Sequence, residues 1–435
     1  MNPISAGILG SALLVFLLFL GMPVAFVMMF VGFLGIGYLT SAPAALSVVA
    51  KTVYEVGAHY PYTIIPLFVL MGGLAGNAGI TRDLYEAFDK WFRKLPGGLG
   101  IATIAACACF AALSGSSVAA AAAMGRIAIP EMRRFNYAPK FAAGIVAAGG
   151  TLSFLIPPSL GFVVYGMLTE QSIGKLLVAG IIPGILLSLA FIGILVFQVR
   201  MDPRLAPATS GEVGWKDKFL ALSGVWQTLL VFFLVMGGIY LGFINPTEAG
   251  GVGATALFAI ALANRRLTLK DIFTSLSEAL RISVMVLFLV AGANVFSYFL
   301  ALSTIPTAVS SWMTSLEVSR YVILAIIVMI YLLLGCFLDA ISMMVLTMPV
   351  VFPVVRTLGF DPIYFGVICV LMMEAGLITP PVGLNVYTVA GVAKDVPMEE
   401  IFRGALPFLI SMIAITILIT AFPKIALFLP SMMGR

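Results

Sequence analysis

Long apolar stretches follow one another along the whole chain. A bilayer core requires roughly 20 apolar residues per helix, and this chain is 61% hydrophobic and only 10% charged. It is therefore predicted to be an all-α polytopic membrane protein, a single integral membrane unit over residues 1–435, with no large soluble domain. We expect membrane spans at residues 4–20, 24–39, 61–77, 138–168, 174–199, 217–243, 246–263, 281–302, 361–392 and 403–429.

Two further apolar segments, residues 97–133 and 320–356, are interrupted near their middles, at Ser114–Ser117 and at Gly335–Ala340. Each half is too short to cross a bilayer, so each segment is predicted to be a re-entrant helical hairpin that enters and leaves on one side. Lys and Arg favour the cytoplasmic side of a membrane, and they flank both ends of the first hairpin. Counting crossings from there predicts that both termini are periplasmic.

The chain also repeats itself at one constant offset, which places Pro23 on Pro246 and Pro157 on Pro380. We call two positions related by this offset equivalent. The spans between the two hairpins are odd in number, which inverts the second copy, and inverted repeats are typical of secondary transporters. The sequence predicts repeat 1 over 1–200, with hairpin 97–133 and a discontinuous helix at 138–168. It predicts repeat 2 over 217–435, with hairpin 320–356 and a discontinuous helix at 361–392, and a cytoplasmic linker at 201–216.

Each repeat combines a hairpin tip with a Pro-Pro interruption in the next span. Backbone outside regular helices survives at membrane depth only inside protein or beside a cavity, and carbonyls freed by proline suit a cation. Oxygen ligands from hydroxyls and carbonyls are right for a hard cation such as sodium. We therefore expect two sodium cages. The first comprises Ser114, Gly115, Ser116, Ser117, Ile156 and Pro157; the second comprises Gly335, Leu338, Asp339, Ala340, Thr379, Pro380 and Gly383.

Other interpretations of these residues remain open. Ser and Gly in membrane helices also serve close packing, and a Pro-Pro pair is also a simple kink; recurrence in register favours an ion or substrate role. Glu374 is either functional or a structural partner to a backbone or hydroxyl group. Arg126 either meets an anionic substrate, pairs with Glu131, or extends toward water. Asn385 can offer both a donor and an acceptor to a ligand.

No group for covalent chemistry is apparent in the sequence. The chain has one histidine, His59, and neither a nucleophile–base pair nor a phosphate-binding Walker motif. We therefore expect neither an enzyme nor an ATP-driven pump.

Several motifs together resemble one transporter family. They are "IIPLFVLMGGLAGNAGI", "SGSSVAAAAAMGRIAIPEM", "FLIPPSLGFVVYG", "INPTEAGGVGA", "GCFLDA" and "TPPVGLNVY". The chain resembles, over essentially its whole length, the large membrane subunit of a TRAP (tripartite ATP-independent periplasmic) transporter, of the DctM-like family. The resemblance implies sodium-driven uptake of a small organic anion across a bacterial inner membrane. The uptake would use an elevator motion, a DctQ-like small four-helix membrane subunit and a DctP-like periplasmic substrate-binding protein.

The anion is expected to bind between the two tips, as a carboxylate held by hydroxyl and amide groups and by helix N-termini. The candidate residues are Ser116, Ser117, Pro158, Ser159, Pro381, Asn385 and Arg126. The alternative is a stand-alone sodium-coupled dicarboxylate or citrate carrier that needs no binding protein. A rival from another class is a channel or a purely structural membrane subunit.

Overall fold

A computed structural model describes residues 2–207, 214–315 and 318–433, and every regular element in them is helical. Five helices are long and apolar enough to cross a membrane among these residues, or eight if each bent helix pair is one span. The first half contains α1 (Pro3–Phe19), α2 (Val24–Leu39), α3 (Ala42–Ala58), η1 (Tyr60–Thr63), α4 (Ile64–Asn77), α5 (Ile80–Phe92), α6 (Gly98–Ser114), α7 (Ser117–Arg134), α8 (Pro139–Leu155), α9 (Leu160–Thr169), α10 (Ile173–Ala179), α11 (Ile181–Met201) and η2 (Pro203–Leu205).

The second half repeats much of this order. It contains α12 (Trp215–Ala221), η3 (Leu222–Gly224), α13 (Trp226–Phe232), a π-helical turn η4 (Phe233–Gly237), α14 (Gly238–Tyr240), α15 (Pro246–Ala263), α16 (Leu269–Ser303), α17 (Ile305–Ser315), α18 (Arg320–Gly335), α19 (Ala340–Thr357), α20 (Pro362–Gly376), α21 (Leu384–Val392), α22 (Met398–Ala421) and α23 (Lys424–Met432).

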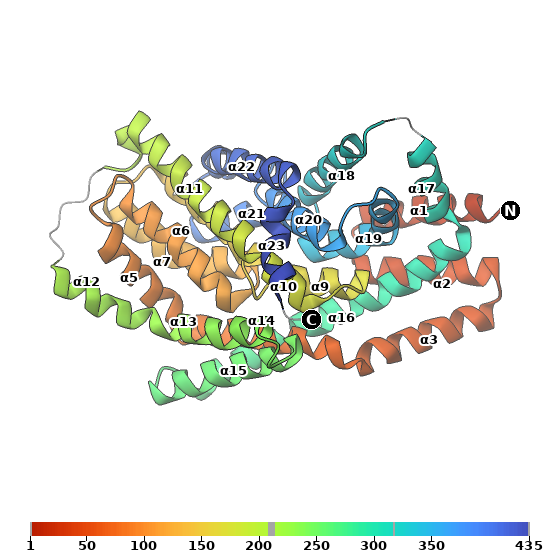
Figure 1. The fold of residues 1–435 in the computed structure, drawn as a ribbon, viewed down its shortest axis with the longest axis horizontal. Coiled ribbons are helices and arrows are strands. Elements are labelled where there is room, and N and C mark those ends of the chain that lie inside the picture. The colour runs from red at the N-terminus through yellow and green to blue at the C-terminus, as the bar shows by residue number, and fades with distance from the viewer. Residues whose placement is uncertain (1, 208–213, 316–317, 434–435) are drawn as a thin grey trace.

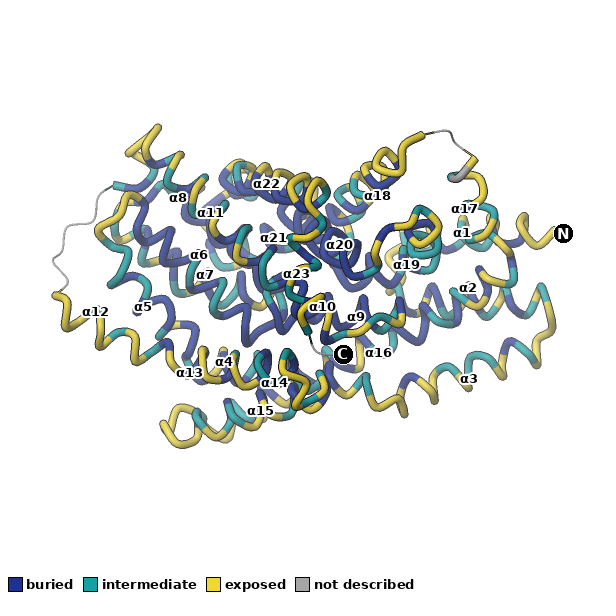
Figure 2. Tube along the Cα trace, in the orientation of Figure 1, coloured by how far each residue is buried: buried dark blue, intermediate teal, exposed yellow. Residues whose placement is uncertain are grey.

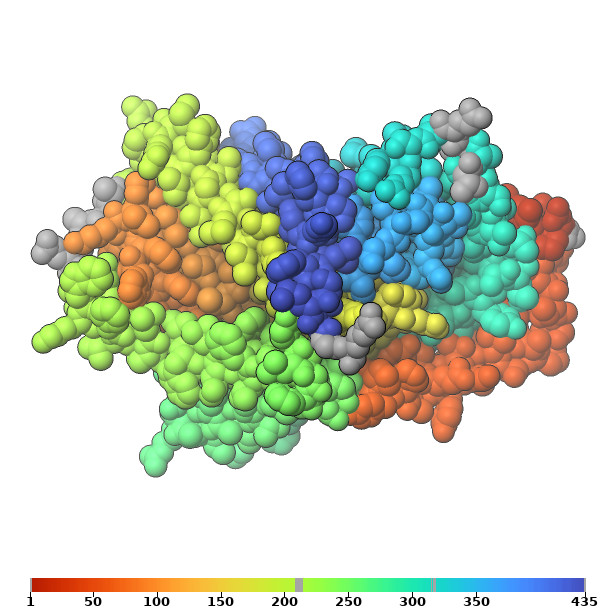
Figure 3. Space-filling model, viewed as in Figure 1, coloured from red at the N-terminus to blue at the C-terminus, as the bar shows by residue number. Residues whose placement is uncertain are grey.

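The helices form two groups that pack against each other. One group joins α1–α4 to α15 and α16, and much of it runs along the lower edge of the view in Figure 1. The other group contains α6–α11 and α18–α23 and holds the most continuous buried region (Figure 2). In the space-filling view the C-terminal helices fill the centre, between the first hairpin and the second (Figure 3). Helices α4 and α16 reach across to α6, α9 and α19, so hairpin helices line the junction of the groups.

Each segment predicted to be a hairpin is a pair of helices that doubles back, so that its two ends lie close together. At the open end of the first pair, the backbone N–H of Leu99 donates to the Tyr137 hydroxyl at 3.3 Å. At the open end of the second, the rings of Tyr321 and Phe360 lie 5.9 Å apart. The two closures sit at matching places, since Tyr137 and Phe360 are equivalent positions.

Capping residues explain where the hairpin helices begin. Gly115 adopts a left-handed conformation with φ 61° and ends α6, as glycine commonly does. The Ser116 side chain then accepts from Ala119 N–H and starts α7. In the second hairpin, the Asp339 carboxylate accepts from Ser342 N–H at 3.0 Å and starts α19. Ser116 and Asp339 are equivalent positions, so the two caps also repeat.

The two predicted helix discontinuities are present. Helix α8 ends at Leu155 and α9 starts at Leu160, with a bend of 42°; α20 ends at Gly376 and α21 starts at Leu384. The Pro157–Pro158 and Pro380–Pro381 bonds are both cis. Helices α8 and α20 also start at equivalent positions, each of them a proline.

The bounds of the helices differ from those of the predicted spans in several places. Helix α16 begins at Leu269 rather than near residue 281, because its first turns are polar and capped by Thr268 and Asp271. Helices α3, α5 and α17 carry too many polar residues to be found as apolar spans. The predicted spans 217–243 and 403–429 are each divided, the latter near Pro423. Of the predicted linker 201–216, residues 208–213 lie outside the described residues.

Candidate functional site

Four short segments at the ends of helices make up the candidate site. We call residues 114–117 tip 1, residues 156–159 break 1, residues 335–340 tip 2 and residues 377–383 break 2. Tip 1 with break 1 forms unit 1, and tip 2 with break 2 forms unit 2. The predicted sodium ligands of each cage come from one such unit.

In unit 1 the tip and the end of the break are joined by backbone. The N–H of Leu160, the first residue of α9, donates to the carbonyl of Gly115 at 3.4 Å. A Cβ added to Gly115 would lie 3.0 Å from the carbonyl oxygen of Pro158. Ser159 is fully buried, and its hydroxyl donates to the carbonyl of Phe154 and accepts from Phe162 N–H. A side chain of break 1 therefore satisfies backbone groups at the end of α8 and the start of α9.

Unit 2 makes a similar backbone connection. The N–H of Gly383, the equivalent of Leu160, donates to the carbonyl of Cys336 at 3.4 Å. Gly335 and Gly376 meet backbone to backbone, because a Cβ on Gly376 would lie 2.5 Å from the Cα of Gly335. The Asp339 carboxylate is occupied on one oxygen by the cap of α19. Three residues in a row are exposed in break 2, namely Pro380, Pro381 and Val382.

The two units are connected through Glu374, the residue whose role the sequence left open. Its side chain is fully buried in α20, and its Oε1 accepts from the Ser117 hydroxyl of tip 1 at 3.2 Å. A hydroxyl partner is one of the alternatives that the sequence predicts. Asn385, also fully buried, donates from Nδ2 to the carbonyl of Ala147 in α8 at 3.4 Å. Each of these two contacts therefore joins the first half of the chain to the second.

The candidate residues for substrate binding do not all share an environment. Pro158 and Ser159 are buried inside unit 1, whereas Pro381 is exposed in break 2. Arg126 lies on an exposed position of α7, roughly 13 Å along the helix from Ser117 at 1.5 Å per residue. Arg126 and Glu131 make no ion pair within the described residues.

An ion pair fastens the outer end of the first hairpin. Arg133, near the end of α7, pairs with Asp395 in the loop between α21 and α22. The Arg133 guanidinium holds the pKa of the Asp395 carboxyl below its ordinary value of 3.8. Arg356, the equivalent of Arg133 in the second half, has no ion pair in the part of the chain that the structure describes.

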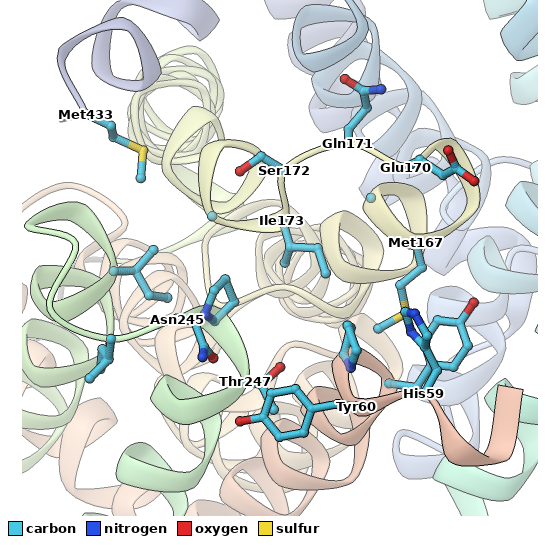
Figure 4. Close-up of a pocket in the computed structure, with 17 residues that line it drawn as sticks. His59, Tyr60, Met167, Glu170, Gln171, Ser172, Ile173, Asn245, Thr247 and Met433 are labelled. Carbon is cyan, nitrogen blue, oxygen red and sulfur yellow. The ribbon is translucent and has the colours of Figure 1, made fainter. Parts of the chain in front are cut away.

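A large cavity lies away from both units. It has a volume of about 750 Å³ and opens between η1, the loop joining α9 to α10, and the connection from α14 to α15. Figure 4 shows His59 and Tyr60 from one side of it and Glu170 and Gln171 from the other. None of the residues predicted to bind sodium or substrate lines this cavity.

One feature of the site was not found from the sequence. Ala147 contributes a backbone carbonyl, which no side-chain motif reveals.

The fold and the site define an integral membrane transport protein with bent or re-entrant helix pairs. Among solved structures, the Alcanivorax borkumensis YdaH transporter superposes with a TM-score of 0.67 at 15% identity, over 90% of this chain and 91% of that chain. This likeness shows the fold.

The family described as "Tripartite ATP-independent periplasmic transporter, DctM component" matches residues 11–425. The chain belongs to this family: it is the large permease subunit of a TRAP transporter, and not an enzyme. It is 37% identical to the C4-dicarboxylate TRAP transporter large permease protein DctM of Pseudomonas aeruginosa, over 91% of this chain and 92% of that protein. It is 34% identical to the isethionate TRAP transporter permease protein DctMQ of Oleidesulfovibrio alaskensis, over 91% of this chain and 62% of that protein.

Proposed function

We propose that this permease couples inward sodium movement to the uptake of a small organic anion, a carboxylate delivered by a periplasmic binding protein. The observation that carries the proposal is the paired backbone connection of the units. Equivalent N–H groups, those of Leu160 and Gly383, donate to the carbonyls of Gly115 in tip 1 and Cys336 in tip 2. Ion and substrate sites of secondary transporters are typically built from discontinuous helices at the interface of two repeats, and this chain has one such tip-to-break connection in each repeat.

The proposed sodium ligands are those of the two units. In unit 1 they are hydroxyls and carbonyls around Gly115 and Pro157, and in unit 2 they include Asp339 and the carbonyls near Pro380. The donor chemistry fits a hard monovalent cation, because every donor in the set is oxygen. The full sets are Ser114, Gly115, Ser116, Ser117, Ile156 and Pro157 in unit 1, and Gly335, Leu338, Asp339, Ala340, Thr379, Pro380 and Gly383 in unit 2.

The anion is proposed to bind between the tips, where α7 and α19 present their N-termini. A helix N-terminus carries a partial positive charge and free N–H groups, which favour a carboxylate. Ser116, Asn385 and Arg126 supply side-chain donors in this arrangement, with further contacts from Ser117, Pro158, Ser159 and Pro381. The relatives are named for C4-dicarboxylate and isethionate, so we propose a small carboxylate or similar anion as the solute.

Transport is proposed to proceed by an elevator motion of the hairpin-bearing group against α1–α4, α15 and α16, within an inverted-topology repeat. Gly72 on α4 supports this, because it allows α4 to lie against tip 1. A Cβ on Gly72 would be 2.9 Å from the carbonyl oxygen of Ser114. At this point of the boundary between the two groups, α4 therefore presents no side chain to tip 1. The sites then face each side of the membrane in turn.

The permease is proposed to work with two partners in a bacterial inner membrane, with both of its own termini in the periplasm. The name DctMQ of the longer relative supports a DctQ-like small membrane subunit. The family description supports a DctP-like periplasmic binding protein. Labelling of a cysteine introduced at position 2, from either side of right-side-out vesicles, tests the orientation, with label reaching it from outside as the expected result.

Sodium-driven uptake in proteoliposomes tests the function. The permease is reconstituted with its small subunit and its binding protein, and radiolabelled carboxylates are screened on the binding protein first. We expect accumulation only with an inward sodium gradient, and strongly reduced uptake by Ser116→Ala and Asp339→Ala variants. Undiminished transport by both variants would remove the ligand assignment, and accumulation without sodium would refute the coupling.

A further inference from the structure

Two oxygen atoms at the junction of the units have no hydrogen-bond donor among the described residues. They are Oε2 of Glu374 and Oδ1 of Asn385, and both residues are completely buried. Buried polar atoms are nearly always satisfied, so each exception needs an explanation. Ser117 occupies only the other carboxylate oxygen, and Ala147 occupies only the amide nitrogen.

Backbone hydrogen bonds bring these two residues to the same region. Leu377 N–H donates to the carbonyl of Glu374 at 3.1 Å, and Asn385 N–H donates to the carbonyl of Leu377 at 3.1 Å. The start of α21 is therefore folded back onto the end of α20, with only Leu377 between the two residues in this chain of bonds.

A third and a fourth helix close the arrangement. Ser117 of α7 touches Glu374, and the carbonyl oxygen of Ser117 lies 3.0 Å from a Cβ added to Gly150 of α8. One helical turn earlier in α8, the carbonyl of Ala147 accepts from Asn385. The contacts thus run in a ring from α20 to α7, α8 and α21 and back to α20.

A carboxylate in this position requires a positive partner. Taking an ion out of water is costly even after the protein relaxes, and one neutral hydroxyl does not offset that cost. Glu374 forms no ion pair among the described residues. The unpartnered atoms are a carboxylate oxygen and an amide oxygen, which are ligands of hard cations. A single negative charge matches a single monovalent ion.

We propose that Oε2 of Glu374 and Oδ1 of Asn385 bind a third sodium ion, between the two units rather than in either. The identity of the ion rests on the sodium coupling proposed above. Ser117 holds the carboxylate in place through its other oxygen and, as the first residue of α7, transmits occupancy of this site to tip 1.

The internal repeat supports a single such site. The first-half equivalents of Glu374 and Asn385 are Thr151 and Phe162. The side chain of Phe162 has no ligating atom, and the Thr151 hydroxyl already donates to the carbonyl of Ala148 at 2.6 Å. The oxygen ligands of this site are therefore present only in the second half of the chain, although the backbone is similar in both halves.

The test measures sodium binding to the purified full chain with ²²Na⁺ at equilibrium, independently of transport. We expect Glu374→Gln to bind one sodium ion fewer per chain than the wild type. Asn385→Ala should weaken that same ion about tenfold or more, because it removes a buried oxygen that contacts a charge. Glutamine keeps the shape of the side chain and an acceptor for Ser117. Thr151→Val is the matched control and should leave the number of ions unchanged.

Infrared difference spectroscopy gives a second readout on the wild type. Sodium addition should produce a carboxylate signal that is absent from Glu374→Gln. Equal sodium counts in the wild type and Glu374→Gln would overturn the proposal. The proposal would also be overturned if the infrared spectrum showed that the Glu374 carboxyl group stays protonated whether or not sodium is present.

Failure of this inference is distinguishable from failure of the proposed function. If Ser116→Ala and Asp339→Ala lose sodium while Glu374→Gln does not, only the third site is wrong. If the wild type binds no sodium, the coupling and the third site fall together.

Discussion

Unit 1 and unit 2 have similar backbone hydrogen bonds, but their breaks differ in exposure and in the side chains that they carry. In both, an N–H at the end of the break donates to a carbonyl of the tip, and the two donors stand at equivalent positions. Break 1 is buried almost throughout, with Ser159 satisfying a carbonyl from within. Break 2 exposes Pro380, Pro381 and Val382. Val382 is the equivalent of Ser159, and it has no hydroxyl.

This difference shows how one repeat can serve two roles. Unit 1 is closed and holds hydroxyl groups, whereas unit 2 is more open and is associated with the acidic side chains, Asp339 in its tip and Glu374 in the helix before its break. Glu374 contacts unit 1 because its carboxylate accepts a hydrogen bond from the Ser117 hydroxyl. The geometry repeats because the backbone repeats, and the chemistry differs because single side chains differ.

The largest expected effect is at the close contact between two glycines beside unit 2. Gly376→Ala places a Cβ 2.5 Å from the Cα of Gly335, where only backbone could move away. Overpacking of this kind costs about 1–3 kcal/mol and occasionally more. We expect a clear fall in the thermal unfolding midpoint in detergent, with loss of uptake.

Ser153 is the equivalent position beside unit 1, and it already carries a side chain. Ser153→Ala should therefore be nearly neutral in the same measurement. If the two variants behaved alike, the backbone contact would not distinguish the units.

The next effect separates charge from capping at tip 2. Asp339→Asn retains an N-cap side chain, whereas Asp339→Ala loses the cap as well, which costs about 0.5–2 kcal/mol. Both should raise the sodium concentration for half-maximal uptake, and only the alanine variant should also lower the unfolding midpoint. Ser116→Thr in tip 1 is the control that keeps a capping hydroxyl. A sodium dependence unchanged by Asp339→Asn would show that the carboxylate acts only as a cap.

An effect on stability alone is expected from the internal bond of break 1. Ser159→Ala removes the hydroxyl that donates to Phe154 and leaves a buried carbonyl unsatisfied. The expected loss is about 1–3 kcal/mol, seen as a lower unfolding midpoint. Val382→Ala in exposed break 2 should change the midpoint much less. A larger fall in the unfolding midpoint from Val382→Ala than from Ser159→Ala would contradict the view that break 1 is the more buried of the two.

The smallest effect concerns the ion pair that fastens α7 but has no counterpart on α19 among the described residues. Because Arg133 lowers the pKa of Asp395 in the folded state, the pair contributes stability above the ordinary pKa of 3.8 and loses it as pH falls through the lowered value. Asp395→Asn should remove this acid-dependent component from the unfolding midpoint. Arg356→Gln, at the position equivalent to Arg133, should leave the pH profile as in the wild type.

Much of the architecture was predictable from residues alone. The SGSS run, the paired Pro-Pro sequences and the constant offset between the halves locate two helix pairs and two discontinuous helices, and the structure interrupts its helices at each of these places. Those features are local, because capping residues and prolines act within a turn of where they stand. The amphipathic helix α5 was missed because it is half polar and packs on one face only.

The contacts that join the units were beyond that local signal. Ser117 and Glu374 lie 257 residues apart, and Asn385 and Ala147 lie 238 apart. No pattern in the sequence pairs a hydroxyl in one half with a carboxylate in the other. Likewise, the close approach of Gly335 to Gly376 depends on how α18 crosses α20.

The amino-acid order by itself determined a membrane-embedded helical chain, its interruptions and its duplication, since hydropathy, proline and capping groups exert their influence over neighbouring residues. Packing of the two halves decided which interruption is buried, which is open, and which oxygens at their junction meet no donor within the described chain. Those outcomes depend on distances between helices remote in sequence, and only the folded arrangement sets such distances.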